Sequence, residues 1–140
     1  MIKKLIKLLF CFFLITTTLS AKNEFFLEGI EFFKNKKFEK AKFKFEQEIV
    51  LNPKNELSYL YLSKIFKNLD NKILQEQNLN TVILLNPNNE EATYNLAKLK
   101  LGNSDYKKSK ELNDSLGTFC EKLCDESKKL KIEIENLSKK

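Results

Sequence analysis

The hexapeptide LNPKNE at residues 51–56 returns as LNPNNE at residues 85–90, and this repetition constrains the fold more than any other feature. The prolines of the two copies, Pro53 and Pro87, are 87 − 53 = 34 residues apart. Each copy follows an apolar run and leads into a segment of mixed polarity. A fixed interval of this length is typical of arrays in which one small motif is repeated. The interval therefore predicts a repeat protein whose repeats begin at residues 22, 56 and 90.

Each repeat is predicted to consist of two amphipathic helices. In the first repeat, residues 25–33 carry one apolar stripe, and a second stripe follows a break at Asn35 and Lys36. This second stripe contains Phe38, Ala41, Phe45 and Ile49. The sequence has only three glycines and two prolines, which favours helices joined by short loops. Asn55 and Asn89 are predicted N-caps, because an asparagine side chain accepts a hydrogen bond from a free N–H group in the first helical turn.

Equivalent positions of the repeats carry similar residues. The small residues Gly29, Ser63 and Ala97 are one interval apart, and they are expected to let paired helices approach closely. With the aromatic residues Phe25 and Tyr59 and the closing prolines, this pattern resembles the tetratricopeptide repeat (TPR) family. The resemblance implies an all-α fold: a short right-handed solenoid of about three helix-turn-helix repeats. These repeats would cover residues 22–55, 56–89 and 90–117.

The remaining residues, 118–140, are predicted to form a C-terminal capping helix. Gly117 is interpreted as the end of the preceding helix, and Thr118 with Glu121 as a capping box that starts the new one. An apolar seam then recurs at helical spacing through Leu123, Ser127, Leu130, Ile134 and Leu137. Such a helix commonly covers the apolar face of the last repeat in an array. A short coiled coil with a partner is the alternative interpretation.

Cys120 and Cys124 are predicted to be free, buried thiols. On the expected continuous helix, residues four apart hold their Cβ atoms ~5–6 Å apart, whereas a disulfide needs ~3.8 Å. A bond would form only if the helix unwound locally. A metal site is not expected, because the sequence has no histidine to complete a set of two thiolates.

The sequence indicates neither an enzyme nor a nucleic-acid-binding protein. The carboxylates are scattered, and no glycine-rich phosphate loop or recognisable nucleophile is present. No cofactor is predicted. Six lysines lie between Lys34 and Lys44, but two phenylalanines among them have core spacing, and the sequence contains no arginine for bidentate phosphate contacts. These lysines are interpreted as a solvated outer face.

Residues 1–21 are predicted to be a secretory signal peptide. MIKKLIK supplies three lysines and no acid, residues 8–19 are apolar or threonine, and Ser20 and Ala21 are small residues that a signal peptidase accepts. An uncleaved anchor is the alternative, but a membrane-spanning helix needs ~20 mostly apolar residues. We therefore expect an exported, periplasmic chain with a net charge of (25 − 3) − 19 = +3 after cleavage. Contact with a membrane is expected to be peripheral or through a partner.

In the resembled family, ligands usually lie in a concave groove lined by the first helix of each repeat. The resemblance places in this groove Phe26, Ile30, Phe33, Leu60, Lys64, Lys67, Tyr94 and Lys98. Lys64, Lys67 and Lys98 are expected to form one basic patch beside apolar anchors, which suits a protein or peptide with apolar side chains and some acids. The predicted function is a non-enzymatic interaction adaptor at the cell envelope.

A weaker resemblance to BamD-like accessory proteins suggests a role in outer-membrane protein assembly. That family is also exported and built of these repeats, but it usually has more repeats and a lipidated cysteine. The alternative function is a structural envelope protein that associates with itself by pairing the seam of its C-terminal helix.

Overall fold

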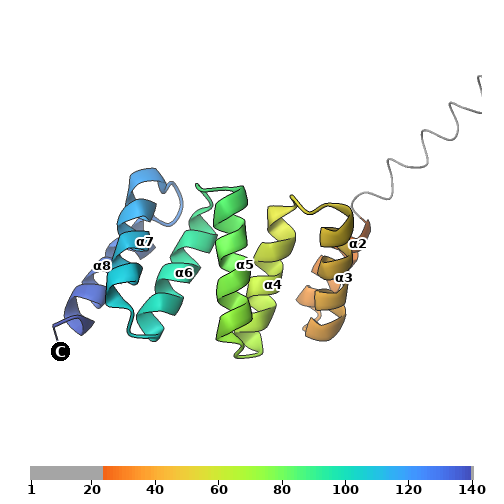
Figure 1. Ribbon diagram of the computed structural model, residues 1–140, viewed down its shortest axis with the longest axis horizontal. Coiled ribbons are helices and arrows are strands. Elements are labelled where there is room, and N and C mark those ends of the chain that lie inside the picture. Colours follow the sequence, from red (N-terminus) through yellow and green to blue (C-terminus); the bar gives the residue numbers. More distant parts are fainter. Residues whose placement is uncertain (1–23, 140) are drawn as a thin grey trace, which may run out of the picture. The chain divides into compact units, whose positions relative to one another are not determined.

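The computed structural model describes residues 24–139, so the predicted signal peptide lies outside the described residues. All regular structure in the described part of the chain is α-helical (Figure 1), and the predicted all-α fold is confirmed. The chain divides into two compact units, a first unit that ends at Asn55 and a second unit that begins at Glu56. None of the described helices is both long enough and apolar enough to span a bilayer.

The helices follow the 34-residue period. The first unit contains α2 (Glu24–Lys34) and α3 (Phe38–Leu51). The second unit contains α4 (Glu56–Asn68), α5 (Lys72–Leu85), α6 (Glu90–Gly102), α7 (Tyr106–Phe119) and α8 (Cys124–Leu137). Within the second unit, α4 packs against α5, α5 against α6, α6 against α7, and α8 against both α7 and α6. The starts of α4, α6 and α8 are 90 − 56 = 34 and 124 − 90 = 34 residues apart, so α8 occupies the place of the first helix of a fourth repeat.

The turn inside each repeat also recurs with this period. Lys36, Asp70 and Ser104 adopt positive φ angles of 57°, 53° and 61°. In the first turn, the N–H groups of Lys36 and Lys37 donate to the carbonyl oxygens of Phe33 and Phe32, and the same pair of bonds is found in the other two turns. This pattern is the Schellman motif, which ends a helix with a residue in the left-handed conformation. The turn that the sequence indicates at Asn35 and Lys36 is therefore a helix C-cap.

Side-chain caps begin several of the helices. Asn89 accepts a hydrogen bond from the Ala92 N–H at 2.9 Å, which confirms the predicted cap of α6. Asn71 and Asp105 cap α5 and α7 in the same way. Asn55 directly precedes α4, and its Nδ2 donates to the carboxylate of the buried Glu48 at 3.0 Å. Short polar side chains thus cap α5, α6 and α7, whereas α3 and α8 begin without a side-chain cap.

Small residues lie where the first helix of each repeat meets its partner. Gly29, Ser63 and Ala97 are all buried, as their shared position predicts. In the first unit, a Cβ atom added to Gly29 would lie 2.7 Å from Cε1 of Phe45. Phe45 and Ala41 are fully buried and form the centre of this unit. The side chain of Phe45 therefore fills the space that glycine leaves open.

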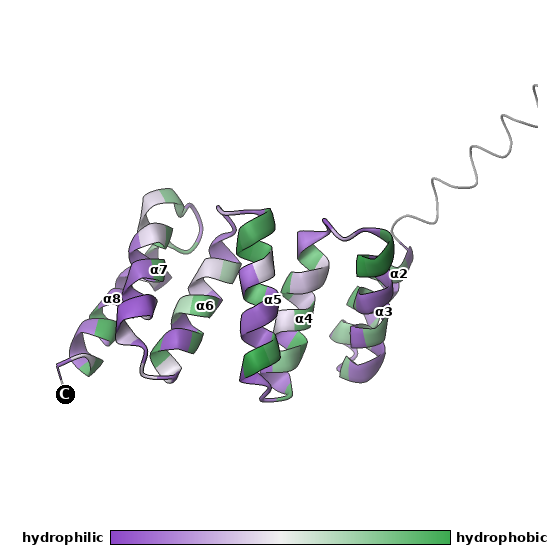
Figure 2. Cartoon of the chain, in the orientation of Figure 1, coloured by the Kyte–Doolittle hydropathy of each residue, from purple (hydrophilic) through white to green (hydrophobic). Residues whose placement is uncertain are grey.

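The core of the second unit has two parts, and Figure 2 shows how apolar and polar residues interleave along its helices. The first part joins α4, α5 and α6 through Leu60, Leu79, Val82, Ala92, Leu96 and Leu99. The second joins α6 to α8 through Ala97, Leu101, Leu130 and Ile134. Leu130 and Ile134 are only 1% and 3% exposed, so the predicted seam of the last helix packs inside the unit. Pairing with another copy through this seam would require α8 to detach first.

The boundary between α7 and α8 differs from the predicted one. Gly117 and Thr118 lie inside α7, which continues to Phe119, and the Thr118 hydroxyl donates to the Ser115 carbonyl instead of capping a new helix. Residues 120–123 form a loop, and Cys120 and Cys124 are joined by a disulfide across it, with their Cα atoms 5.3 Å apart. The prediction of two free thiols is therefore wrong. It assumed a continuous helix, and the backbone leaves the helix between the two cysteines.

Candidate functional site

Two hollows lie in the second unit, and both are lined by Asn95 of α6. The first hollow has a volume of about 660 Å³ and is bordered by the first turns of α4 and α6 and by the loops before α6 and α8. Its apolar lining consists of Leu57, Leu60, Tyr94 and Leu123. Its amide lining consists of Asn86, Asn88, Asn89 and Asn95, and its charged lining of Glu90, Glu91, Glu121 and Lys122. An apolar surface beside several amides can bury a side chain while hydrogen bonding to polar groups of the same ligand.

Local hydrogen bonds hold the amide lining in place. The Nδ2 of Asn86 donates to Glu56 at 3.0 Å, and its Oδ1 accepts from the Asn88 N–H at 3.2 Å. Asn95 donates to the backbone carbonyl of Glu91 at 2.8 Å. The repeated Asn-Pro turn thus has a second use, because it ends α5 and also presents amide groups to the hollow.

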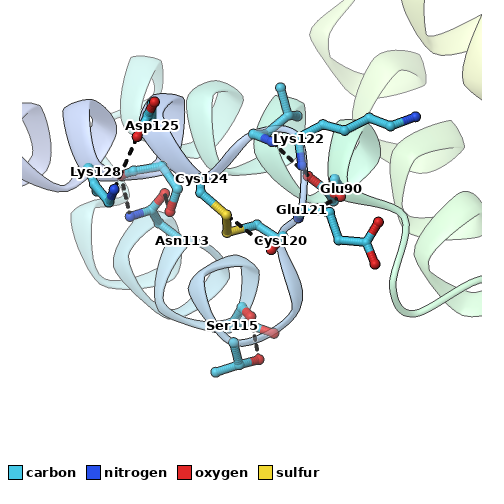
Figure 3. The surroundings of a disulfide bond; sticks show 12 residues. Glu90, Asn113, Ser115, Cys120, Glu121, Lys122, Cys124, Asp125 and Lys128 are labelled. Carbon is cyan, nitrogen blue, oxygen red and sulfur yellow. Dashed lines mark hydrogen bonds and ion pairs between the residues drawn. A yellow bond between two sulfur atoms is a disulfide. The ribbon is translucent and has the colours of Figure 1, made fainter.

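The loop before α8 closes one side of the first hollow and is held by Glu90. The backbone N–H groups of Glu121, Lys122 and Leu123 donate to the Glu90 carboxylate at 2.9, 2.9 and 2.8 Å (Figure 3). The bond from Leu123 is the largest cause that lowers the pKa of Glu90 below its ordinary value of 4.5, followed by the bond from Glu121. The disulfide joins the residues on either side of this loop. The carboxylate and the disulfide together replace the Asn-Pro turn of the earlier repeats.

The second hollow is basic. It has a volume of about 360 Å³ and lies at the turn between α4 and α5 and beside the last turns of α6. Its charged lining consists of Lys67, Lys72, Lys98 and Asp70. The formal charge of these four side chains is 3 − 1 = +2. Lys98 also forms an ion pair with Glu133 of α8 at 3.1 Å. The arrangement favours an anionic group over a cationic one.

Four of the five predicted groove residues of the second unit line these hollows, and Lys64 lines neither. Tyr94 and Leu60 line the first, although Leu60 is only 4% exposed and belongs mainly to the core. Lys67 and Lys98 line the second. Lys64 forms an ion pair with Glu91 at 2.8 Å and lies 5.0 Å above the ring of Tyr61.

The predicted basic patch is therefore partly neutralised. Lys64 and Lys98 each form an ion pair with a glutamate. The comparison of equivalent positions in the repeats did not predict these pairs. Lys64 lies on α4 and its partner Glu91 on α6, and Lys98 lies on α6 and its partner Glu133 on α8. Because the two pairs join neighbouring first helices, part of the lysine charge holds these helices together instead of facing a ligand.

The three predicted groove residues of the first unit have neighbours of their own. The ring centroid of Phe26 is 5.8 Å from that of Phe45, and the ring of Phe33 meets Phe38 edge-on at 5.7 Å. Ile30 is half-buried. A role for these residues in binding stays a prediction.

Several lining residues were missed by the sequence analysis. Leu57 lies about one turn before the predicted Leu60, and Asn95 directly follows the predicted Tyr94. The repeat interval alone does not mark either residue. Leu123 was assigned to the apolar seam of the C-terminal helix. No group of three or more metal-ligating side chains is found among residues 24–139.

No family model and no curated protein matches this sequence. Solved structures do match the fold. The TPR2B domain of yeast Sti1 in its pHsp70 complex has a TM-score of 0.75 and 19% identity over 82% of this chain and 96% of that domain. The Yersinia enterocolitica type III secretion chaperone SycD, in complex with a peptide of the translocator YopD, has a TM-score of 0.74 and 11% identity over 85% and 93% of the two chains.

A third similar structure is the first TPR of Spaghetti (RPAP3) bound to the HSP90 peptide SRMEEVD. Its TM-score is 0.68, with 14% identity over 80% of this chain and 86% of that one. The described chain thus has the all-α repeat fold of TPR domains. At these identities the likeness concerns the fold, and the ligands named belong to those proteins.

Proposed function

We propose that this protein is a non-enzymatic adaptor that binds a partner protein through an extended peptide in the two hollows of the second unit. The observation that carries the proposal is the pair of hollows, one apolar and amide-rich and one basic, which share Asn95. The similar TPR structures with bound peptides support this use of the fold. The predicted groove residues Tyr94, Lys67 and Lys98 belong to the proposed surface.

The proposal is tested by binding measurements on groove variants. Replacing Tyr94 with alanine removes an aromatic contact surface from the first hollow, and we expect partner or peptide binding to weaken by about 1–3 kcal/mol while helicity is retained. Leu84→Ala is the matched control, because Leu84 is 81% exposed on α5 and lines neither hollow. Isothermal titration calorimetry with peptides selected from a displayed random library gives the affinities, and circular dichroism gives the helicity. Equal affinities for wild type and the Tyr94 variant would refute the assignment of the first hollow as a binding surface.

We further propose that the adaptor works at the cell envelope, as an exported accessory subunit of outer-membrane protein assembly. Residues 1–21 have the pattern of a signal peptide. The disulfide between Cys120 and Cys124 supports export, because disulfides persist in oxidising compartments such as the periplasm. Fusing residues 1–30 to alkaline phosphatase, which is active only after export, tests the localisation. A fusion that stays inactive while the phosphatase with a known signal is active would contradict it.

A further inference from the structure

We infer that the second unit recognises an extended peptide in which an apolar side chain and an aspartate or glutamate lie about three residues apart. The inference rests on the proposed function and specifies its ligand. It follows from the chemistry of the two hollows and from their separation along α6.

The first hollow suits one apolar side chain and the peptide backbone around it. Leu57 is 43% exposed at its edge, with Tyr94 and Leu123 beside it. The amides of Asn88 and Asn95 carry both donors and acceptors, as do the N–H and C=O groups of an extended peptide. A volume of about 660 Å³ is ample for a leucine or phenylalanine side chain and its backbone.

The second hollow carries more positive than negative charge, and two of its three lysines have no acidic partner in the described part of the chain. Three other lysines of α4 and α6 have acidic partners: Lys64 with Glu91, Lys98 with Glu133, and Lys100 with Glu76. Within residues 24–139, Lys67 and Lys72 form no ion pair with an acidic side chain, and both are exposed. A ligand carboxylate in this hollow would gain two lysine partners. Asp70 is the one acidic residue of the lining that would repel it.

The distance between the hollows sets the spacing in the peptide. On α6, the first hollow is centred near Glu91 and Tyr94, and the second near Lys98 and Gly102. These centres are about seven residues apart, which is ~10 Å along a helix with a rise of ~1.5 Å per residue. An extended peptide advances ~3.3 Å per residue, so ~10 Å corresponds to about three residues. A helical ligand would need about seven residues for the same span.

The test is a selection from a displayed library of random dodecapeptides, made in parallel against the full chain and a charge-reversed variant. We expect wild type to enrich peptides in which an apolar residue and an acid lie three or four positions apart. Lys67→Glu with Lys72→Glu should replace the acid in the selected peptides by lysine or arginine and keep the apolar residue. A variant that merely unfolded would not produce this exchange of preference. Lys107→Glu with Lys110→Glu, on the exposed side of α7, is the control with the same charge change and should keep the wild-type preference.

The outcomes separate this inference from the proposed function. If wild type enriches peptides that depend on Tyr94 but show no acid at this spacing, the inference is wrong and the adaptor function stands. Spacing near seven residues would mean a helical ligand and would also overturn the inference. If the enriched peptides bind Leu57→Ala and Tyr94→Ala variants as well as wild type, both the ligand and the proposed binding surface are wrong. Affinity for synthetic peptides with a leucine and an aspartate two to eight positions apart should peak at the predicted spacing.

Discussion

At Gly29, the absence of a side chain decides how closely α2 and α3 pack. The ring of Phe45 occupies the space that a Cβ atom would need, with three ring carbons within 3.0 Å of that position. Phe45 is fully buried, so its ring has little room to move away. In the other two repeats, Ser63 and Ala97 stand at the position of Gly29, and the smaller buried residues Leu79 and Asn113 stand at the position of Phe45.

Gly29→Ala is therefore expected to destabilise the first unit by about 1–3 kcal/mol, the usual cost of overpacking a core. Gly117→Ala is the matched control, because Gly117 lies within α7 and nothing is within 4 Å of its added Cβ. Alanine at position 117 should stabilise the second unit by ~0.5–1 kcal/mol, because alanine has a better helix propensity than glycine. Urea unfolding followed by circular dichroism measures both. Equal effects of the two substitutions would show that the contact with Phe45 is relieved without cost.

At the level of elements, the loop between α7 and α8 is the part that departs most from the repeat pattern. The earlier repeats end with an Asn-Pro turn, and here Cys120 and Glu121 stand at the corresponding positions. The disulfide and the Glu90 carboxylate hold the loop in that turn's place. Each of these two interactions makes a separate prediction.

Removing the disulfide should destabilise the second unit. Cys120→Ser with Cys124→Ser releases a loop with a sequence separation of 4, and the chain-entropy estimate for so short a loop is about 2 kcal/mol. We expect a lower urea midpoint and faster amide exchange in residues 120–124. Wild type treated with dithiothreitol should behave like the double variant. If reduction changes neither the midpoint nor the exchange, the Glu90 interaction alone maintains the loop.

Glu90 should make stability depend on pH. Its pKa is lowered in the folded chain, so its contribution is present above the ordinary value of 4.5 and is lost as the pH falls through the lower folded-state pKa. Glu90→Gln should therefore lower the melting temperature at neutral pH, and the difference from wild type should shrink in acid. Glu121→Gln, in the same loop, is the control and should show neither effect. A difference that stays constant with pH would mean that the carboxylate charge does not stabilise the loop.

At the scale of the whole molecule, the period extends one helix beyond the three predicted repeats. α8 begins where a fourth repeat would begin, and it buries Leu130 and Ile134 against α6 and its neighbours. Its other side carries exposed charged residues, among them Lys128, Lys129 and Lys131. A terminal helix with one apolar and one polar side both completes the core and ends the array.

Leu130→Asp tests whether α8 has this capping role. A charge at a position that is 1% exposed should detach α8 and expose Ala97 and Leu101, so we expect lower thermal stability and a larger scattering mass. Ile132→Asp is the matched control, because Ile132 is 60% exposed on the same helix. Light scattering and thermal melts compare the two variants with wild type. A wild-type dimer that Leu130→Asp converts into a stable monomer would instead support self-association through the seam.

The sequence by itself determined the features that depend on neighbours close along the chain. Helical periodicity, the cap at Asn89 and the small residues one interval apart all reflect contacts within one repeat, and they predicted the all-α repeat fold. Only the tertiary structure decided the loop at residues 120–123, because its backbone N–H groups are satisfied by Glu90, more than 30 residues away. The hollows and the ion pairs of Lys64 with Glu91 and of Lys98 with Glu133 were decided in the same way, since they depend on which side chains of different repeats face each other.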